Sequence, residues 1–262
     1  MKLRAQRSIT AGRLLWKIIA TRGPKGAPAL LLLPGTLGTA AIFAEVFQRL
    51  GGKLRIVAVT YPMIDGIERL ADSLAALLTT LGIPRASVAG SSLGGFLAQH
   101  FAARHPERVE RLLLGNTLWD PGQVRRIVGG ASVEQLRAAP AAMHQNMVLS
   151  SLKAWPEVEP GVVRLKAILQ DSGRRLLGAR AIKARVLAVQ AAPAAPKLTV
   201  PDSRITVLDC ADDPLLPRAV QDAMRQRYPG AHHVRMRVGG HYPYILRPDE
   251  YCAVLERALK LS

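Results

Sequence analysis

The feature that most constrains the fold is the stretch Gly90–Gly95 (GSSLGG), in which a serine stands among small residues. A strand-like apolar run precedes the stretch and a helical pattern follows it. A serine at a strand-to-helix turn of the form G-x-S-x-G takes a strained backbone with positive φ, so the residues two before and two after it must be small. Gly90 and Gly94 meet this need. The stretch therefore predicts a sharp turn that raises the Ser92 hydroxyl above the edge of a sheet.

Strand and helix patterns alternate on both sides of this turn. Apolar or alternating runs predict strands at 13–21, 30–33, 54–60, 87–89, 109–114, 205–208 and 234–238. Helical periodicity predicts helices at 67–81, 93–104, 218–228 and 248–261. This order predicts an α/β protein with a mostly parallel central sheet flanked by helices.

The alternation stops between residues 117 and 201. Helical patterns at 133–152 and 162–177 have no clear strand between them, and an Ala/Pro-rich stretch at 191–196 has the composition of a linker. We therefore expect a core domain made of 1–116 and 202–262, with 117–201 inserted as a helical cap.

A serine hydroxyl needs a neighbouring base to become a nucleophile at neutral pH. His241 follows the last predicted strand, and functional groups of parallel sheets gather beyond the carboxyl ends of the strands. We therefore predict that Ser92 is the nucleophile and His241 its base. The other histidines are interpreted as solvated or structural: His100, His105, His144, His232 and His233.

The acid that orients the histidine is expected after a strand between Ser92 and His241. Asp209, Asp212 and Asp213 are available there. We predict Asp213, because Asp209 still belongs to the strand and Asp212 to the turn. Asp212 stays an alternative, since the length of the turn is not fixed by the sequence.

Two backbone N–H groups are predicted to form an oxyanion hole. Leu93 begins the helix after the serine, where its N–H has no partner within the helix. Thr36 lies in the glycine-containing loop after the strand at 30–33 and is expected to supply the second N–H.

With these residues in place, residues 30–116 and 205–261 resemble the α/β-hydrolase family. Within that family, the stretches 34–40, 90–99 and 239–244 resemble the maspardin-like branch. The resemblance implies an eight-stranded, mostly parallel sheet with a helical cap. It also implies a serine hydrolase that cleaves a carboxylic ester or thioester through an acyl-enzyme on Ser92.

The same resemblance leaves other functions open. The maspardin-like branch is associated with protein binding as well as hydrolysis, so a non-catalytic binding module is the main alternative. C–C bond hydrolysis, perhydrolysis and hydroxynitrile cleavage use the same triad on this fold. The presence of His241 favours an enzyme.

The expected substrate is a small acyl or aromatic ester, and the expected chemistry needs no metal or other cofactor. Apolar cap residues either line the substrate cavity or form the core of the cap itself: Leu149, Leu152, Trp155, Val163, Leu165 and Ile168.

The formal net charge of +17 would attract polyanions, but no helix-turn-helix, zinc-finger or RNA-binding signature accompanies it. We interpret the charge as a solvated surface and do not expect a nucleic-acid partner.

No stretch is apolar enough to span a bilayer, and the basic start lacks a signal-peptide pattern. Cys210 and Cys252 are isolated, which fits a cytoplasmic location.

Overall fold

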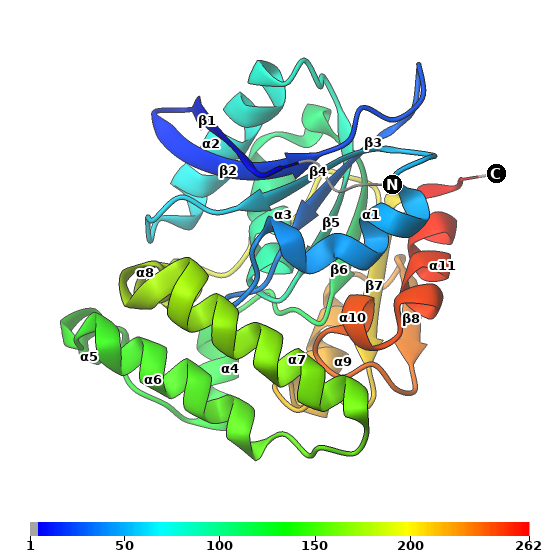
Figure 1. Ribbon diagram of the computed structural model, residues 1–262. Helices are drawn as coiled ribbons and strands as arrows, with labels where there is room; N and C mark the ends of the chain where they lie inside the picture. The colour runs from blue at the N-terminus through cyan, green and yellow to red at the C-terminus, as the bar shows by residue number, and fades with distance from the viewer. Residues whose placement is uncertain (1–4, 262) are drawn as a thin grey trace.

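An eight-stranded sheet runs through the structure, a computed structural model that describes residues 5–261 apart from the side chain of Val128 (Figure 1). Its strand order is β1-β2-β4-β3-β5-β6-β7-β8. The strands β3 to β8 are parallel to one another, and β2 pairs antiparallel with both β1 and β4. This confirms the predicted mostly parallel sheet. The strands are β1 (Arg7–Ala11), β2 (Leu14–Ala20), β3 (Ala29–Leu33), β4 (Arg55–Thr60), β5 (Ala86–Ser91), β6 (Val109–Gly115), β7 (Ile205–Cys210) and β8 (His232–Met236).

The central strands are apolar on both faces because helices cover both faces. Along β3, Leu31 and Leu33 enter one hydrophobic core while Leu30 and Leu32 enter the other. The first core contains α2 (Ile67–Thr80), α3 (Leu93–Arg104) and α9 (Arg218–Arg227). The second contains η1 (Ala40–Phe43), α1 (Ala44–Leu50), α10 (Pro243–Leu246) and α11 (Pro248–Leu259). Short 3₁₀ turns precede two strands, η2 (Pro106–Arg108) before β6 and η5 (Asp202–Arg204) before β7.

The parallel register brings the carboxyl ends of the central strands to one edge of the sheet. Leu33 pairs with Gly90, Ser91 with Gly115, and Gly115 with Leu208. The loops that follow β3, β5, β6, β7 and β8 therefore start beside one another. All of the predicted site residues belong to these loops or begin the helix that follows one of them.

The segment between β6 and β7 is helical, and Figure 1 shows α5 to α8 gathered beside the sheet. Its elements are α4 (Pro121–Val128), α5 (Val133–Ala138), α6 (Ala141–Ser151), η3 (Leu152–Ala154), α7 (Pro160–Asp171), the π-helical turn η4 (Ser172–Leu177) and α8 (Gly178–Gln190). We call this segment the cap. That residues 117–201 form a separate inserted unit stays a prediction.

Some predicted boundaries were wrong. The helix predicted at 133–152 is two helices, because Pro140 has no N–H to donate and Ala139 before it is extended, with φ −60° and ψ 139°. The helix predicted at 162–177 changes to a π turn after Asp171. The last strand is His232–Met236, two residues before the predicted 234–238, because its register is set by pairing with β7. The sequence patterns also missed β1, α1, α4, α8 and α10.

No helix within residues 5–261 combines the length and the hydropathy needed to cross a membrane.

Candidate active site

The predicted turn at Ser92 is present. Ser92 has φ 55° and ψ −120°, a conformation that side-chain-bearing residues rarely adopt. A Cβ on Gly90 would lie 2.2 Å from the Gly94 carbonyl oxygen, and a Cβ on Gly94 would lie 2.0 Å from that of Leu33. Neither contact is sterically possible, so both glycines are required by the close approach of backbone segments.

Contacts from β6 and the residues after it hold the turn in place. The Ser92 N–H donates to the Gly115 carbonyl at 3.1 Å, and the Thr117 hydroxyl donates to the Ser92 carbonyl at 2.6 Å. A Cβ on Gly95 would lie 2.7 Å from the Thr117 Cβ, so the helix start fits closely against this threonine. Sequence reasoning missed Thr117, since no local motif marks it.

The structure brings Asp213 to His241. The Nδ1–H of His241 donates to Asp213 Oδ2 at 2.8 Å, with the two side chains 3% and 0% exposed. The other carboxylate oxygen of Asp213 accepts the N–H groups of Leu215 at 2.8 Å and Leu216 at 3.2 Å. The carboxylate is therefore fixed on one side by its own turn and on the other by the imidazole.

The two neighbouring acids have different partners. Asp212 accepts the N–H groups of Gly239 at 3.1 Å and Gly240 at 2.9 Å, and so holds the loop that carries His241. Asp209, on β7, forms ion pairs with Arg225 and Arg235. Of the three acids, Asp213 is the one hydrogen-bonded to the imidazole, so the geometry favours it over Asp212 as the orienting acid.

Asn116, the residue after β6, joins three segments of the site. Its side-chain N–H donates to the Gly240 carbonyl at 2.8 Å, and its side-chain oxygen accepts the Cys210 N–H at 3.0 Å. Its positive φ of 39° directs the chain into this position. Asn116 was not predicted, although an asparagine directly after a buried strand is a signal that could have been used.

Ser92, His241, Thr36 and Leu93 all line one cavity of about 330 Å³. No Asp, Glu, Lys or Arg is among its lining residues, which are otherwise mainly apolar. Among the described residues, no hydrogen bond joins the Ser92 hydroxyl to the His241 ring. The two side chains therefore share one cavity without a hydrogen bond between them, and such a contact between a nucleophile and its base is often long before a substrate binds.

The six apolar cap residues, which the sequence left between cavity lining and cap core, fall into three groups. Leu152 and Trp155 belong to the second hydrophobic core and also line the cavity, whereas Leu149 and Leu165 belong to that core alone. Val163 and Ile168 are exposed and belong to neither. Helical periodicity identified apolar residues of the cap but could not assign them to cavity, core or surface.

The loop after β3 lies against the serine turn. A Cβ on Gly35 would be 3.3 Å from the Ser92 Cβ. The Gly35 carbonyl accepts the Gly38 N–H at 3.0 Å, which fixes the peptide between Gly35 and Thr36. Because the N–H and C=O of a trans peptide point in opposite directions, the Thr36 N–H points away from this turn. Thr36 and Leu93 both line the cavity with Ser92, and their role as oxyanion donors stays a prediction.

A buried arginine of the cap holds the same loop. Arg185 of α8 is 2% exposed and donates to the carbonyls of Thr36 at 2.9 Å and Gly38 at 2.7 Å. Its guanidinium carbon lies 5.1 Å from the ring centroid of Tyr61, whose hydroxyl donates to the Pro34 carbonyl at 2.7 Å. Burial lowers the pKa of Arg185 to about 10, so the group is still a cation at neutral pH. Sequence reasoning missed this contact between residues 149 positions apart.

The other histidines lie outside this cavity. His105 contacts Asp72, and ring nitrogens of His144 and His233 contact the backbone carbonyls of Leu136 and Tyr228. His100 is buried in α3, whereas His232 is exposed at the start of β8. None of the five lines the cavity that holds Ser92, and their interpretation as solvated or structural stays a prediction.

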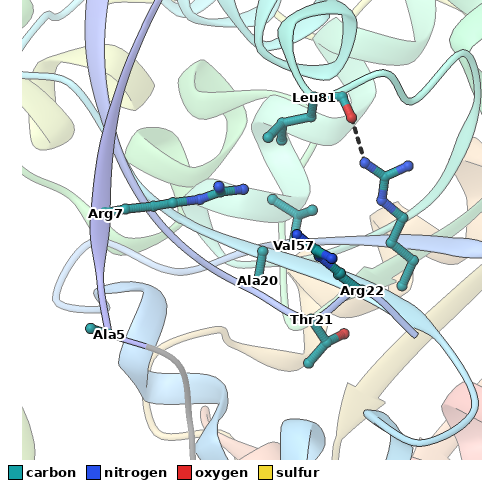
Figure 2. Close-up of a pocket in the computed structure, with 8 residues that line it drawn as sticks. Ala5, Arg7, Ala20, Thr21, Arg22, Val57 and Leu81 are labelled. Atoms are coloured by element: carbon teal, nitrogen blue, oxygen red, sulfur yellow. Dashed lines mark hydrogen bonds between the residues drawn. The ribbon is translucent and has the colours of Figure 1, made fainter. Parts of the chain in front are cut away.

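A recess near the amino-terminal end of β4 contains arginines but no nucleophile or base. It is lined by Arg7, Arg22 and Arg55 together with Ala5, Ala20, Thr21, Val57 and Leu81 (Figure 2). The Arg55 guanidinium donates to the carbonyls of Leu81 and Gly82 at the end of α2, which accounts for its position. Within the described part of the chain, no group of three or more His, Cys, Asp or Glu side chains is arranged to hold a metal ion.

Comparison with known proteins adds an independent result. Residues 30–254 match the family described as "Alpha/beta hydrolase family". The chain is 27% identical to maspardin of Danio rerio, covering 87% of this chain and 73% of that protein, and 28% identical to maspardin of Homo sapiens, covering 84% and 71%. The crystal structure of the enol-lactonase from Burkholderia xenovorans LB400 matches with a TM-score of 0.79 at 20% identity, over 97% of this chain and 100% of that one. At 20% sequence identity, this match shows that the two proteins share a fold and says nothing about a shared activity.

Proposed function

Because the chain belongs to the α/β-hydrolase family and its maspardin-like branch, we propose that it is a serine hydrolase that cleaves a carboxylic ester or thioester. One observation carries the proposal: a buried His241–Asp213 pair opens into the cavity that also holds Ser92 on its strained turn. A histidine oriented by a carboxylate beside a serine is the arrangement that acyl transfer requires.

In the proposed mechanism, His241 Nε2 takes the Ser92 proton as the Ser92 oxygen attacks the substrate carbonyl. Asp213 holds the Nδ1–H tautomer and stabilises the imidazolium that forms. The N–H groups of Leu93 and Thr36 stabilise the negative charge on the carbonyl oxygen. His241 returns the proton to the leaving group, and water then cleaves the acyl-enzyme with His241 as base.

The lining of the cavity supports an uncharged acyl or aromatic group in the substrate. Placing a charged group there would remove it from water without a partner of opposite charge. A lactone is itself a cyclic carboxylic ester, so the name of the structurally similar enol-lactonase is compatible with this class.

A non-catalytic protein-binding module is the second candidate. The observation that favours it is the lack of a hydrogen bond between Ser92 and His241 among the described residues. Other triad chemistries, namely C–C hydrolysis, perhydrolysis and hydroxynitrile cleavage, would use the same groups.

Labelling by a fluorophosphonate probe separates the two candidates. An activated serine forms a covalent bond to the phosphorus and displaces fluoride, so we expect stoichiometric labelling of the wild type at Ser92. Ser92→Ala is the control and should remain unlabelled. A folded wild-type protein that takes up no label at Ser92 would exclude the hydrolase proposal and favour the binding module.

Two further parts of the proposal concern the surroundings of the protein. A cytoplasmic location is supported by two buried free thiols, Cys210 and Cys252.

The high positive charge is proposed to form a solvated surface and not a nucleic-acid site. Strong, salt-dependent retention on heparin would contradict this interpretation of the charge.

A further inference from the structure

A second cavity lies beside α5 and α6 of the cap. Its volume is about 530 Å³, and it is lined by Ala131, Gln135, Leu136, Ala138, Ala139, Met143, His144 and Met147. Only Gln135 and His144 among these are polar. Met147 also lines the cavity that holds Ser92, so the two cavities adjoin at this side chain.

One face of α6 runs along both cavities. Met143, Met147 and Ser151 are spaced four residues apart, so they follow one another along the helix. Met143 belongs to the outer cavity, Met147 to both, and Ser151 to the cavity with Ser92. At 1.5 Å per residue, this face is about 12 Å long. An extended peptide backbone advances about 3.5 Å over three bonds. An extended alkyl chain has similar bond lengths, so roughly ten of its bonds cover the ~12 Å of this face.

The methionines of this face are exposed. Met143 is 61% exposed and Met147 is 47% exposed, so neither belongs to the core of the cap. Methionine is flexible and polarisable, which suits it to contact an alkyl chain of variable position. The ring of His144 is fixed by a 2.8 Å hydrogen bond between its Nε2 and the Leu136 carbonyl, which holds α5 against α6.

We propose that this groove between α5 and α6 binds the distal part of a long acyl chain whose carbonyl carbon lies at Ser92. The inference rests on the proposed hydrolase function and narrows its substrate to long-chain acyl esters or thioesters. Met147 lines both the groove and the cavity at Ser92, and this shared side chain is why we assign the groove to the chain of the substrate.

The first test compares p-nitrophenyl esters from butyrate to palmitate. Each methylene that passes from water into the groove should raise kcat/KM by up to about fourfold. Met143→Glu places a charge beside the distal chain, so the ratio of kcat/KM for palmitate to that for butyrate should fall about tenfold or more. Met63→Glu is the matched control, because Met63 is 58% exposed and lines neither cavity. That variant should keep the wild-type ratio.

The outcomes separate this proposal from the underlying function. If butyrate is cleaved but the ratio is the same in wild type and Met143→Glu, the acyl groove is excluded and the hydrolase proposal stands. If instead Met143→Glu abolishes self-association in light scattering while the ratio is unchanged, the groove is a contact to a second copy and the proposal is wrong.

Binding of 1-dodecanol tests the groove even in a protein without turnover. Trp155 lines the cavity at Ser92, so tryptophan fluorescence can follow the titration. We expect binding about tenfold weaker in Met143→Glu than in Met63→Glu. Equal affinity in both variants would overturn the proposal, whatever the result of the esterase assay.

Discussion

At the scale of single residues, Asp212 and Asp213 show how adjacent carboxylates acquire different tasks. Both stand in the turn after β7, but Asp213 contacts the His241 ring whereas Asp212 holds the backbone of the loop that carries it. One residue is therefore placed to orient the imidazole and the other to position its loop.

Substitution of each aspartate should separate these tasks. In the proposed mechanism Asp213→Asn favours the wrong imidazole tautomer, so we expect kcat to fall about 10³- to 10⁴-fold with little loss of stability. Asp212→Asn weakens the hydrogen bonds to Gly239 and Gly240, so it should lower the melting temperature and reduce kcat far less. Steady-state kinetics and thermal unfolding of both variants check this. A larger loss of kcat in Asp212→Asn would reverse the assignment.

At the scale of elements, the junction of β5 and α3 depends on backbone segments in close contact. The carbonyl of Leu33 on β3 lies where a Cβ of residue 94 would be. The geometry of Ser92 is thus a property of two strands and a helix together.

Gly94→Ala should disrupt this junction. The added methyl group would overlap backbone, which cannot move aside as a side chain can, so we expect a loss of about 3 kcal/mol or more in the free energy of unfolding. Gly52→Ala is the control, since a Cβ there meets nothing within 4 Å. Urea denaturation measures both, and equal midpoints would contradict the steric argument.

A second junction connects the cap to the predicted oxyanion hole. Arg185 donates to the carbonyls of Thr36 and Gly38, and the Ser172 hydroxyl donates to the Leu37 carbonyl. A displacement of α8 or η4 would therefore disturb the loop to which the Thr36 N–H belongs.

Replacement of Arg185 should lower catalysis more than stability. Arg185→Met removes the desolvation cost of the buried guanidinium but leaves the Thr36 and Gly38 carbonyls without this donor, so we expect a modest decrease in the urea midpoint. The loop carbonyls lose their donors, and we expect kcat to fall about tenfold or more with a smaller change in KM. Arg185→Lys should recover part of the loss. Lys183→Met, which changes α8 contacts only within the cap, is the control. Unchanged kcat in Arg185→Met would exclude a positioning role.

At the scale of the whole molecule, stability should depend on pH through a buried histidine that does not line the active-site cavity. His100 is buried beside Phe96, with ring centroids 4.7 Å apart. Burial, together with the nearby Arg104, lowers the pKa of His100 from 6.5 to about 4. Between these values the unfolded chain binds a proton that the folded protein does not, so stability falls as the pH drops from 6.5 toward 4.

His100→Leu should reduce this acid sensitivity. His100 has a pKa of 6.5 in the unfolded chain and about 4 in the folded protein. As the pH is lowered from 7 to 5, this difference decreases the free energy of unfolding by about 2 kcal/mol. The difference between the urea midpoints at these pH values should therefore be smaller in His100→Leu than in the wild type. His232→Leu, at an exposed position, should retain the wild-type difference. An unchanged pH dependence in His100→Leu would show that other groups cause it.

The sequence by itself determined those features that follow from local steric rules and periodicity. Apolar runs at Leu30–Leu33 and Leu112–Leu114 imply strands covered on both faces, and the alternation of strands and helices implies a parallel sheet. The glycines around Ser92 imply a sharp turn because nothing larger fits across it. The position of His241 beyond the last strand follows from the same topology.

Only the tertiary structure decided which groups meet. The choice between Asp212 and Asp213 depends on the path of one turn relative to a loop 28 residues away, and Arg185 reaches Thr36 across 149 residues. The same holds for the cap, where periodicity found apolar residues but packing placed Leu165 in the core, Trp155 in both core and cavity lining, and Val163 on the surface. Contacts of this kind arise from the relative placement of distant segments, and no pattern within a single segment encodes that placement.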